Sequence, residues 1–205
     1  MKFDLHMHTT RHSPDSQIDP FDLVRQAREI GLDGVVITEH DWLWTEAELE
    51  ELRAVADGLV VLAGIEVGTR EGHFLAYGVH DPFAFPIGIG VAEMCDEAHR
   101  QGGAVVAAHP FRWGQPFDEI LRETQPKLDG LEVMTNNMDA LCRERAAAIK
   151  REYPLTGIGS SDAHQLQNLG VCYTEFAGKI ENSRDLVEAI RSGRAVAYDR
   201  RQHAG

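Results

Sequence analysis

Short runs of apolar and β-branched residues alternate along the chain with longer stretches in which apolar residues recur at helical spacing. This alternation is typical of a mostly parallel sheet covered by helices. The expected strands cover residues 3–8, 34–38, 59–65, 73–79, 104–108, 130–134 and 155–159, and a shorter segment at 195–198 has the same character. The sequence therefore predicts an α/β fold.

Helical periodicity fills the intervals between these strands. The expected helices cover residues 20–30, 45–56, 91–101, 118–123, 139–151 and 183–192. Asp19 followed by Pro20 is a typical helix start, because aspartate caps free N–H groups and proline suits the first helical position. Glycines stand where three of the helices should end, at Gly31, Gly102 and Gly193. We expect a single domain over residues 1–205, with the Pro- and Gly-rich segment 81–90 as a rim or lid.

Composition narrows the class of protein. A chain of 205 residues with 43% hydrophobic residues can bury the core of one globular domain. It contains no apolar run long enough to span a bilayer and opens directly on a strand pattern, so we expect a soluble, cytoplasmic protein. The three cysteines form no C-x-x-C pair, which disfavours a disulfide framework or a thiolate zinc site. The net charge of −13 disfavours a long nucleic acid as ligand.

Residues with metal-binding side chains stand at the ends of most of the expected strands. They are His6 and His8 after the first strand, His40 after the second, Glu66 after the third, His73 at the start of the fourth, His109 after the fifth, and Asp162 and His164 after the seventh. In a barrel of parallel strands the carboxyl ends meet on one face, so these side chains should gather there. His6 and His8 are two apart and should point the same way from an extended strand.

Asp15, in a turn-like segment just beyond the first pair, completes a set of nine candidate metal ligands. One zinc site uses only about three or four protein ligands, so the supply predicts two or three divalent ions. Imidazole and carboxylate without thiolate suit Zn, Mn or Fe. Two ions about 3.5 to 4 Å apart can share a hydroxide and hold the oxygens of a phosphoryl group. Metal-dependent hydrolysis is the expected chemistry.

Six short motifs containing these residues occur in order along the chain. They are His6-Met7-His8-Thr9, Thr38-Glu39-His40-Asp41, Gly64-Ile65-Glu66, Gly72-His73, His109-Pro110 and Ser161-Asp162-Ala163-His164. On these motifs the chain resembles the PHP (polymerase and histidinol phosphatase) family, over about residues 1–200. The resemblance implies a distorted (β/α)7 TIM-like barrel that carries up to three metal ions.

The resemblance also implies how the candidate ligands divide among the ions. One ion would take His6, His8, Glu66 and Asp162, a second Glu66, His73 and His109, and a third Asp15, His40 and His164. Glu66 would then bridge two ions. Glu39 departs from the family, which commonly has Asp at this position. Because Glu39 adjoins a ligand, the departure concerns the surroundings of that ligand more than metal binding itself.

Four polar residues near these motifs are candidates for contact with substrate. Arg112 follows His109 closely and could donate paired hydrogen bonds to phosphate oxygens, and Arg11 is a weaker candidate of the same kind. Asn136 and Asn137 follow the sixth strand and could also bind substrate, although turn chemistry explains such a pair equally well.

Two further groups of residues have simpler interpretations. The tryptophans that follow the ligand segments could wall the pocket, but packing at the barrel rim is the simpler role for Trp42, Trp44 and Trp113. The remaining histidines are expected to lie outside the metal site; they are His12, His80, His99 and His203.

The expected function is a metal-dependent phosphoesterase that hydrolyses a small phosphomonoester or nucleotide by a metal-bridging hydroxide. The leaving group would be stabilised by the third metal or protonated by a metal-bound water, with Asp162 or His164 as alternative proton donors. The expected partner is a small phosphorylated substrate rather than a membrane, and the oligomeric state is left open. Two other functions also stay open: an amidohydrolase-like C–N hydrolase, which usually needs a carboxylated lysine where this chain has Glu66, and a catalytically inactive, metal-binding or regulatory PHP module.

Overall fold

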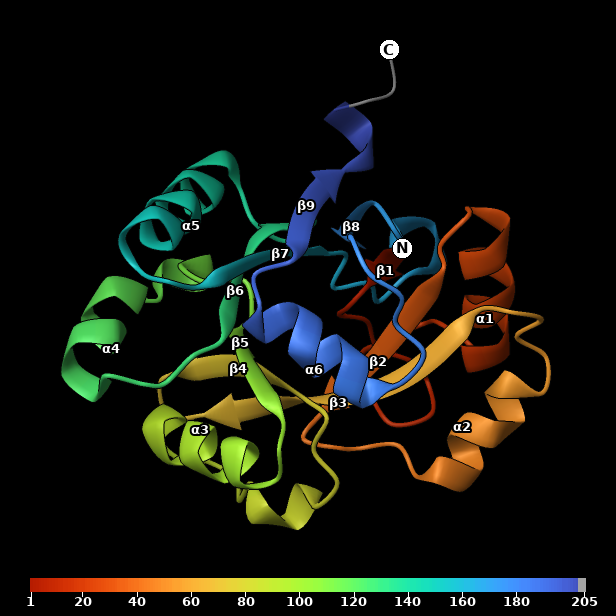
Figure 1. Ribbon diagram of the computed structural model, residues 1–205, viewed down its shortest axis with the longest axis horizontal. Helices are drawn as coiled ribbons and strands as arrows, with labels where there is room; N and C mark the ends of the chain where they lie inside the picture. The colour runs from red at the N-terminus through yellow and green to blue at the C-terminus, as the bar shows by residue number, and fades with distance from the viewer. Residues whose placement is uncertain (203–205) are drawn as a thin grey trace.

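The computed structural model describes residues 1–202, over which the chain forms an α/β fold with a nearly closed, barrel-shaped sheet (Figure 1). Its strands are β1 (Lys2–Asp4), β2 (Gly34–His40), β3 (Val60–Thr69), β4 (Gly72–Tyr77), β5 (Ala104–Ala107), β6 (Gly130–Thr135), β7 (Thr156–Ser160), β8 (Cys172–Phe176) and β9 (Ala195–Asp199). They lie in the order β7-β6-β5-β4-β3-β2-β1-β8-β9. His203 lies outside the described residues.

Each expected helix is present, with ends that differ by a few residues. The helices are α1 (Pro20–Glu29), α2 (Glu46–Arg53), α3 (Val91–Arg100), α4 (Phe117–Thr124), α5 (Ala140–Glu152) and α6 (Ser183–Arg191). The helix start at Asp19 is confirmed, because its side chain accepts hydrogen bonds from the N–H groups of Phe21 and Asp22. Local sequence therefore determines where α1 begins.

The sheet departs from a parallel arrangement at β4, β8 and β9. β4 runs antiparallel to both β3 and β5, since only Arg70 and Glu71 separate it from β3 and so short a connection can form only a hairpin. This reversal corrects the expectation of parallel order around the fourth strand. Its consequence is that the amino end of β4, where His73 stands, lies beside the carboxyl ends of the parallel strands.

β2 and β3 run past their expected ends, so His40 and Glu66 lie within these strands rather than after them. Two further strands, β8 and β1, differ more from the prediction. β8 was missed because its buried positions include Cys172 and Thr174, which give a weak hydrophobic alternation. β1 ends at Asp4 instead of continuing to residue 8. The chain beyond β1 nevertheless stays against the sheet, because Met7 forms an isolated parallel bridge with Ala163. The segment expected at 195–198 is β9.

A side chain joins β7, which ends the sheet on one side, to β8, which is paired with the last strand of the other side, β9. The hydroxyl of Thr174 accepts a hydrogen bond from the N–H of Gly159 at 2.9 Å and donates one to the carbonyl of the same residue at 2.7 Å. Thr174 is fully buried. The Thr174 hydroxyl thus serves as acceptor for the N–H and as donor for the C=O of Gly159, which backbone groups of a neighbouring strand would otherwise satisfy.

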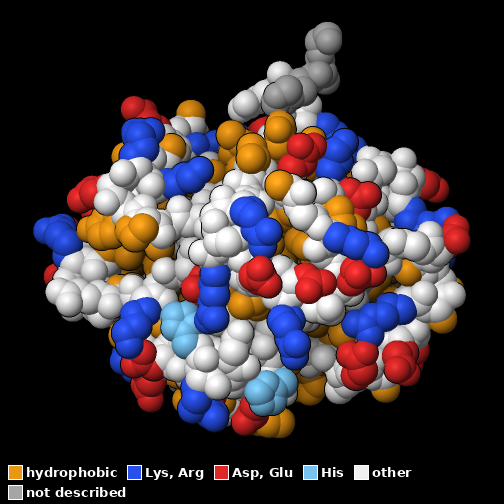
Figure 2. Space-filling model, viewed as in Figure 1, with side chains coloured by type: hydrophobic (Ala, Val, Ile, Leu, Met, Phe, Trp, Pro, Cys, Tyr) orange, Lys and Arg blue, Asp and Glu red, His pale blue; other side chains and the backbone are white. Residues whose placement is uncertain are grey.

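Helix α6 lies across one end of the barrel (Figure 1). Its buried Leu186 and Ile190 pack with residues of the barrel interior such as Phe3, Leu62 and Tyr77. On the face that α6 covers, Lys and Arg side chains are interspersed with Asp and Glu (Figure 2). The opposite end of the barrel is left for the polar residues of the strand ends. Within residues 1–202, none of the helices combines the length and the apolar character needed to cross a bilayer.

We expect Thr174→Val to lower the free energy of unfolding by about 2 to 4 kcal/mol, because valine has the shape of threonine but leaves the N–H and C=O of Gly159 buried without partners. Chemical denaturation would measure the change. Thr124→Val is the matched control, since the Thr124 hydroxyl also donates to a backbone carbonyl but lies half-buried on α4. It should cost less than about 1 kcal/mol. Equal losses in the two variants would contradict this role of Thr174.

Candidate metal centre

The expected ligands gather at the end of the barrel opposite α6. His6 and His8 follow β1, His40 ends β2, Glu66 lies in β3, His73 lies in β4, His109 follows β5, and Asp162 and His164 follow β7; Asp15 joins them from the loop before α1. The register of the sheet brings two of these residues together, because His40 and Glu66 are paired across β2 and β3. All nine side chains take part in one connected set of close contacts.

Glu66 lies at the centre of this cluster and is 1% exposed. Its Oε1 lies 3.0 Å from Nδ1 of His73 and 3.0 Å from Nε2 of His109. These two imidazoles come from strands that are adjacent in the sheet, β4 and β5. One carboxylate oxygen is therefore shared between two nitrogens, as the second of the implied ligand sets requires.

The other oxygen of Glu66 faces a different group of histidines. Oε2 lies 2.8 Å from Nδ1 of His40, 3.4 Å from Nε2 of His6 and 3.3 Å from Nε2 of His8. Asp162 closes the space from the far side, with Oδ1 at 3.4 Å from Nε2 of His6 and 3.3 Å from Nε2 of His8. Two carboxylates and two imidazoles thus point into one small volume.

Asp15 and His164 form the outer part of the cluster. Oδ2 of Asp15 lies 3.3 Å from Nε2 of His40 and 3.2 Å from Nε2 of His164. The ring of His8 lies between those of His40 and His164, at centroid distances of 4.1 and 4.3 Å. The third implied set is therefore also assembled, at the more exposed edge of the site.

The chemistry of this donor set fits divalent cations. Oε2 of Glu66 is buried and finds no aligned hydrogen-bond donor among residues 1–202, although three imidazole nitrogens lie within 3.4 Å of it. A buried carboxylate oxygen without a donor is costly, and a cation among these nitrogens would satisfy it. Imidazole and carboxylate in this mixture are ligands that Zn, Mn and Fe accept.

Electrostatics keep the carboxylates of the cluster ionised. Burial alone would raise the pKa of Glu66, but the imidazoles of His6, His109 and His40 hold it well below its usual range. The pKa of Asp162 is also lowered, because His6 and His8 outweigh the effect of burial. Burial opposes the charged form of His40, yet its contacts with Glu66 and Asp15 raise its pKa to about 9. The carboxylates of the site are therefore ionised, which is the form that binds cations.

Two of the clustered residues have a backbone conformation that L-amino acids rarely adopt. His109 has φ 30° and Asp162 has φ 50°. Such left-handed conformations are held only where surrounding contacts enforce them, and they occur often at functional sites. Here the N–H of Asp162 donates to the carbonyl of His6 at 2.8 Å, which ties the segment after β7 to the segment after β1.

Arg112 adjoins the cluster, as its place after His109 suggests. Its Nη1 donates to Oδ2 of Asp162 at 3.1 Å, and its guanidinium lies over the ring of Trp113 at 4.0 Å. The side chain is 25% exposed, so part of it faces solvent at the mouth of the site. This placement agrees with a role in holding an anionic substrate.

The other three substrate candidates have different surroundings. Nδ2 of Asn137 donates to Oδ2 of Asp162 at 2.6 Å, so this asparagine adjoins the cluster. Asn136 instead accepts a hydrogen bond from Arg201 at 3.0 Å. Arg11 pairs with Glu51 of α2 at 3.0 Å. Arg112 and Asn137 therefore adjoin the cluster through Asp162, whereas Arg11 and Asn136 are paired elsewhere.

Three histidines expected outside the cluster have other partners or lie at the surface. Nε2 of His12 lies 2.8 Å from Glu48, Nε2 of His99 lies 2.8 Å from Asp129, and His80 is exposed. The expected role of the tryptophans in packing at the barrel rim fits only the one that is buried. Trp44 is 3% exposed, whereas Trp42 is 46% and Trp113 is 77% exposed.

Sequence reasoning passed over Glu132, which lies in β6 and is fully buried. Its Oε1 lies 3.0 Å from Nδ1 of His6, and its Oε2 accepts a hydrogen bond from the N–H of His109 at 2.5 Å. The hydroxyl of Ser160 also donates to it. A charged residue in an otherwise apolar strand was the available signal, since such a group is buried only when it is paired.

A cavity of about 660 Å³ opens beside the cluster. It lies between the β3–β4 turn and residues 109–116, and His73, His109, Arg112 and Trp113 are among its lining residues. Its volume suits a small organic ligand. The ligand would contact both the cluster and the arginine.

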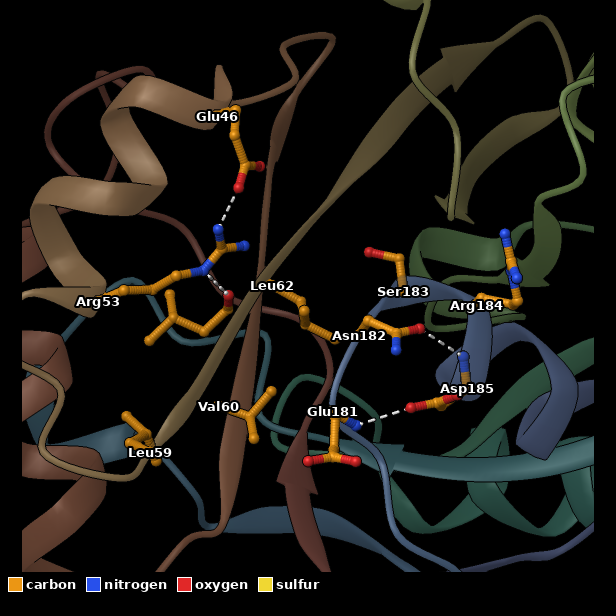
Figure 3. A pocket seen from close by; sticks show the side chains of 11 residues that line it. Glu46, Arg53, Leu59, Val60, Leu62, Glu181, Asn182, Ser183, Arg184 and Asp185 are labelled. Carbon is orange, nitrogen blue, oxygen red and sulfur yellow. Dashed lines mark hydrogen bonds and ion pairs between the residues drawn. The ribbon is translucent and has the colours of Figure 1, made fainter.

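A larger cavity of about 1020 Å³ lies at the other end of the barrel, between α2, the start of β3 and the start of α6 (Figure 3). Arg53 there pairs with Glu46 and donates to the carbonyl of Val61, while Asn182 caps α6 by accepting from the N–H of Asp185. None of the described residues that line it is a histidine. Arg53 and Asn182 thus serve the fold, and the smaller cavity is the one that adjoins the candidate ligands.

A barrel-shaped α/β sheet with histidines and carboxylates gathered at its strand ends defines the class of barrel proteins that includes metal-dependent hydrolases. More narrowly, the chain belongs to the PHP domain family. The model of the PHP domain matches residues 4–131, and a model described as PHP-associated matches residues 142–195. The second segment supplies β7 and β8 to the same barrel.

Individual relatives agree with this assignment. The chain is 30% identical over 144 residues to the uncharacterised protein MJ1587 of Methanocaldococcus jannaschii. The aligned region covers 65% of this chain and 81% of that protein. Among solved structures, a two-domain protein of Bacteroides vulgatus containing a predicted PHP-like metal-dependent phosphoesterase is similar with a TM-score of 0.75 and 25% identity. The likeness covers 97% of this chain but 64% of the Bacteroides protein, so this chain spans less than two thirds of that protein.

An amidohydrolase of Chromobacterium violaceum, solved with bound sulfate and no metal, has a TM-score of 0.66 to this chain. It is 16% identical, and the likeness covers 95% of this chain and 97% of that protein. At this identity the likeness shows a shared fold. The chemistry of this chain has to be argued from its own residues.

We expect protein purified without chelator to carry at least about two divalent ions per chain, because the donors exceed the needs of one ion. Removal of metal by a chelator should lower the melting temperature, since ions that bind only the folded chain stabilise it by mass action. Elemental analysis and thermal unfolding would measure both. Less than about one ion per chain, or a melting temperature unchanged by chelator, would count against a multinuclear centre.

Proposed function

We propose that this protein is a phosphoesterase that hydrolyses a small phosphomonoester or nucleotide with the help of two or three divalent ions. The observation that carries the proposal is Glu66, a buried carboxylate with imidazoles on both of its oxygens and an Oε2 that lacks a donor among the described residues. A bridging carboxylate between metal ions has these surroundings. Membership of the PHP domain family supports the same class of reaction.

The ions would be held in three sets. His6, His8, Glu66 and Asp162 would hold one, Glu66, His73 and His109 the second, and Asp15, His40 and His164 the third. When bound, divalent ions in such sites polarise phosphoryl oxygens and activate water near neutral pH. We propose Zn, Mn or Fe as the metals, from the mixture of imidazole and carboxylate ligands.

The chain's own residues would bind and orient the substrate. Arg112 has guanidinium donors beyond the one engaged by Asp162, and these would hold phosphoryl oxygens at the edge of the cavity. Asn137 would support Asp162 from the other side. The lowered pKa of Asp162 keeps this carboxyl ionised, which argues against Asp162 as the proton donor when the leaving group departs.

The alternative of an amidohydrolase-like C–N hydrolase has the Chromobacterium structure in its favour. Against it, Glu66 occupies the position between the histidines where such enzymes usually carry a carboxylated lysine. A catalytically inactive module is the third alternative, and it would bind metal without turnover. A panel of phosphomonoesters, nucleotides and amides, tested with metal-loaded protein, separates the three.

We also propose a cytoplasmic location, since the three cysteines are free thiols.

We expect Glu66→Gln to lower kcat by at least about a hundredfold and to reduce bound metal, while circular dichroism stays near native. A neutral amide cannot offset the repulsion of two cations, so one ion should be lost or displaced. Steady-state kinetics and elemental analysis would measure these effects. His80→Ala is the control, because this exposed histidine lies outside the cluster, and it should keep activity within a few-fold. Full metal content and full activity in Glu66→Gln would remove the bridging carboxylate from the mechanism.

We expect Arg112→Ala to lower kcat/KM by roughly tenfold or more with metal content unchanged, because charge-assisted hydrogen bonds contribute about 1.5 to 3 kcal/mol. Arg145→Ala is the matched control. Arg145 also lies over an aromatic ring of the same loop, that of Phe111 at 3.9 Å, but pairs with Asp118 on α4. Unaltered kinetics in Arg112→Ala, or equal losses in both variants, would assign Arg112 to the fold rather than to the substrate.

A further inference from the structure

We infer that Glu132 is a positioning residue of the metal centre, which fixes the ring proton of His6 on Nδ1 and so aims the lone pair of Nε2 at the ion. The inference rests on the proposed function, because it concerns how that centre holds its metal. Glu132 lies in β6, far from His6 in the sequence, and both side chains are fully buried. Buried carboxylates are retained where they are paired, and the partners of Glu132 belong to the centre.

Three donors converge on the Glu132 carboxylate. Nδ1 of His6 lies 3.0 Å from Oε1, the N–H of His109 lies 2.5 Å from Oε2, and the hydroxyl of Ser160 also donates to Oε1. An ionised carboxylate can only accept hydrogen bonds. The proton of a neutral His6 ring therefore stays on Nδ1, on the side away from the centre.

The free nitrogen of His6 then faces the acidic residues of the centre. Nε2 lies 3.4 Å from Oε2 of Glu66 and 3.4 Å from Oδ1 of Asp162. A nitrogen that holds no proton can bind a cation, whereas the other tautomer would direct an N–H at it. Glu132 thus prepares His6 as a ligand without itself reaching the ion.

His8 is oriented in the same way through an intermediate hydroxyl. Ser13 donates its hydroxyl proton to Oε2 of Glu39 at 2.5 Å, so its oxygen is left to accept from Nδ1 of His8 at 3.3 Å. Nε2 of His8 accordingly faces Glu66 and Asp162, at 3.3 Å from each. Two separate carboxylates, both buried, therefore impose the same tautomer on the two histidines of the first motif.

Glu132 also restrains a second candidate ligand. The N–H of His109 donates to it, and His109 has the left-handed φ of 30°. The ladder between β6 and β7 shifts register between Glu132 and Met134, which marks a bulge at this point of the strand. The carboxylate thus links a bulge in β6 to the orientation of His6 and to the backbone of His109.

Glu132→Gln keeps the size of the side chain but removes one of the two oxygens that accept hydrogen bonds from His6, His109 and Ser160. An amide has one accepting oxygen and an NH2 group, so at least one of the three donors would meet another donor. We expect the variant to fold and to bind Zn²⁺ at least about tenfold more weakly than wild type, the range observed when the partner of a ligating histidine is changed. Isothermal titration calorimetry would measure the affinity, and circular dichroism and thermal unfolding of the chelated proteins would report the fold.

Asp129→Asn is the matched control. It replaces another carboxylate that contacts a histidine, His99 at 2.8 Å, but lies outside the centre, so its Zn²⁺ affinity should equal that of wild type. Ser13→Ala tests the second route with a small change, and it should also weaken Zn²⁺ binding. Wild-type affinity in a folded Glu132→Gln, or an equal loss in Asp129→Asn, would overturn the inference, and wild-type affinity in Ser13→Ala would overturn the second route through His8. A wild-type chain that binds no divalent ion would overturn the proposed function together with it.

A measurement on the unmutated protein keeps the test valid if Glu132→Gln fails to fold. In Zn²⁺-loaded protein with ¹⁵N-labelled histidine, nuclear magnetic resonance distinguishes the ring nitrogen that carries hydrogen from the one that binds metal. We expect His6 and His8 to bind through Nε2 and to show hydrogen-bonded Nδ1–H signals. Coordination of either ring through Nδ1 would overturn the inference.

Discussion

The buried carboxylate of Glu66 is the constraint on which the rest of the site depends. A charged group with 1% exposure is stable only if positive or donating groups surround it, and the barrel supplies them from β2, β4, β5 and the segment after β1. Strand order, register and the reversal of β4 can each be understood as ways to bring imidazoles to this one residue. The same crowding that satisfies Glu66 also concentrates the ligands that divalent ions need.

Much of the site could be predicted because its residues stand at strand ends that local sequence defines. His109 and Asp162 follow recognisable strands and His40 ends one, so their convergence required only a barrel. Glu132 could not be found this way, since its contact with His6 joins residues 126 apart. The missed strand β8 has a related cause, because its place is set by pairing with β1 and β9 rather than by its own composition.

The residues around the cluster fall into two groups, those that border a cavity and those that are buried behind the candidate ligands. Arg112 and Trp113 border a cavity, so they are available to a ligand. Glu132 and Glu39 are fully buried, and they act on the Nδ1 side of His6 and, through Ser13, of His8. Glu39 in particular accepts from Thr9, Ser13 and Trp44, which a shorter aspartate would reach less easily. The longer side chain of Glu39, where the family commonly has aspartate, is thus matched by hydrogen-bond donors on both of its oxygens.

The hydrogen bonds that join the segment after β1 to the segment after β7 have a consequence for biosynthesis. The N–H of Asp162 donates to His6, and the N–H of His8 donates to Ala163 at 3.0 Å, so the first and last metal-binding motifs are held together as neighbours. A ribosome makes these motifs more than 150 residues apart, as the separation of 155 between Ser161 and His6 illustrates. A nascent chain that has reached β6 already carries His6, His8 and Glu66 but lacks Asp162. An ion that needs Asp162 or His164 as a ligand therefore has its complete site only after synthesis has passed β7, late in the maturation of the protein.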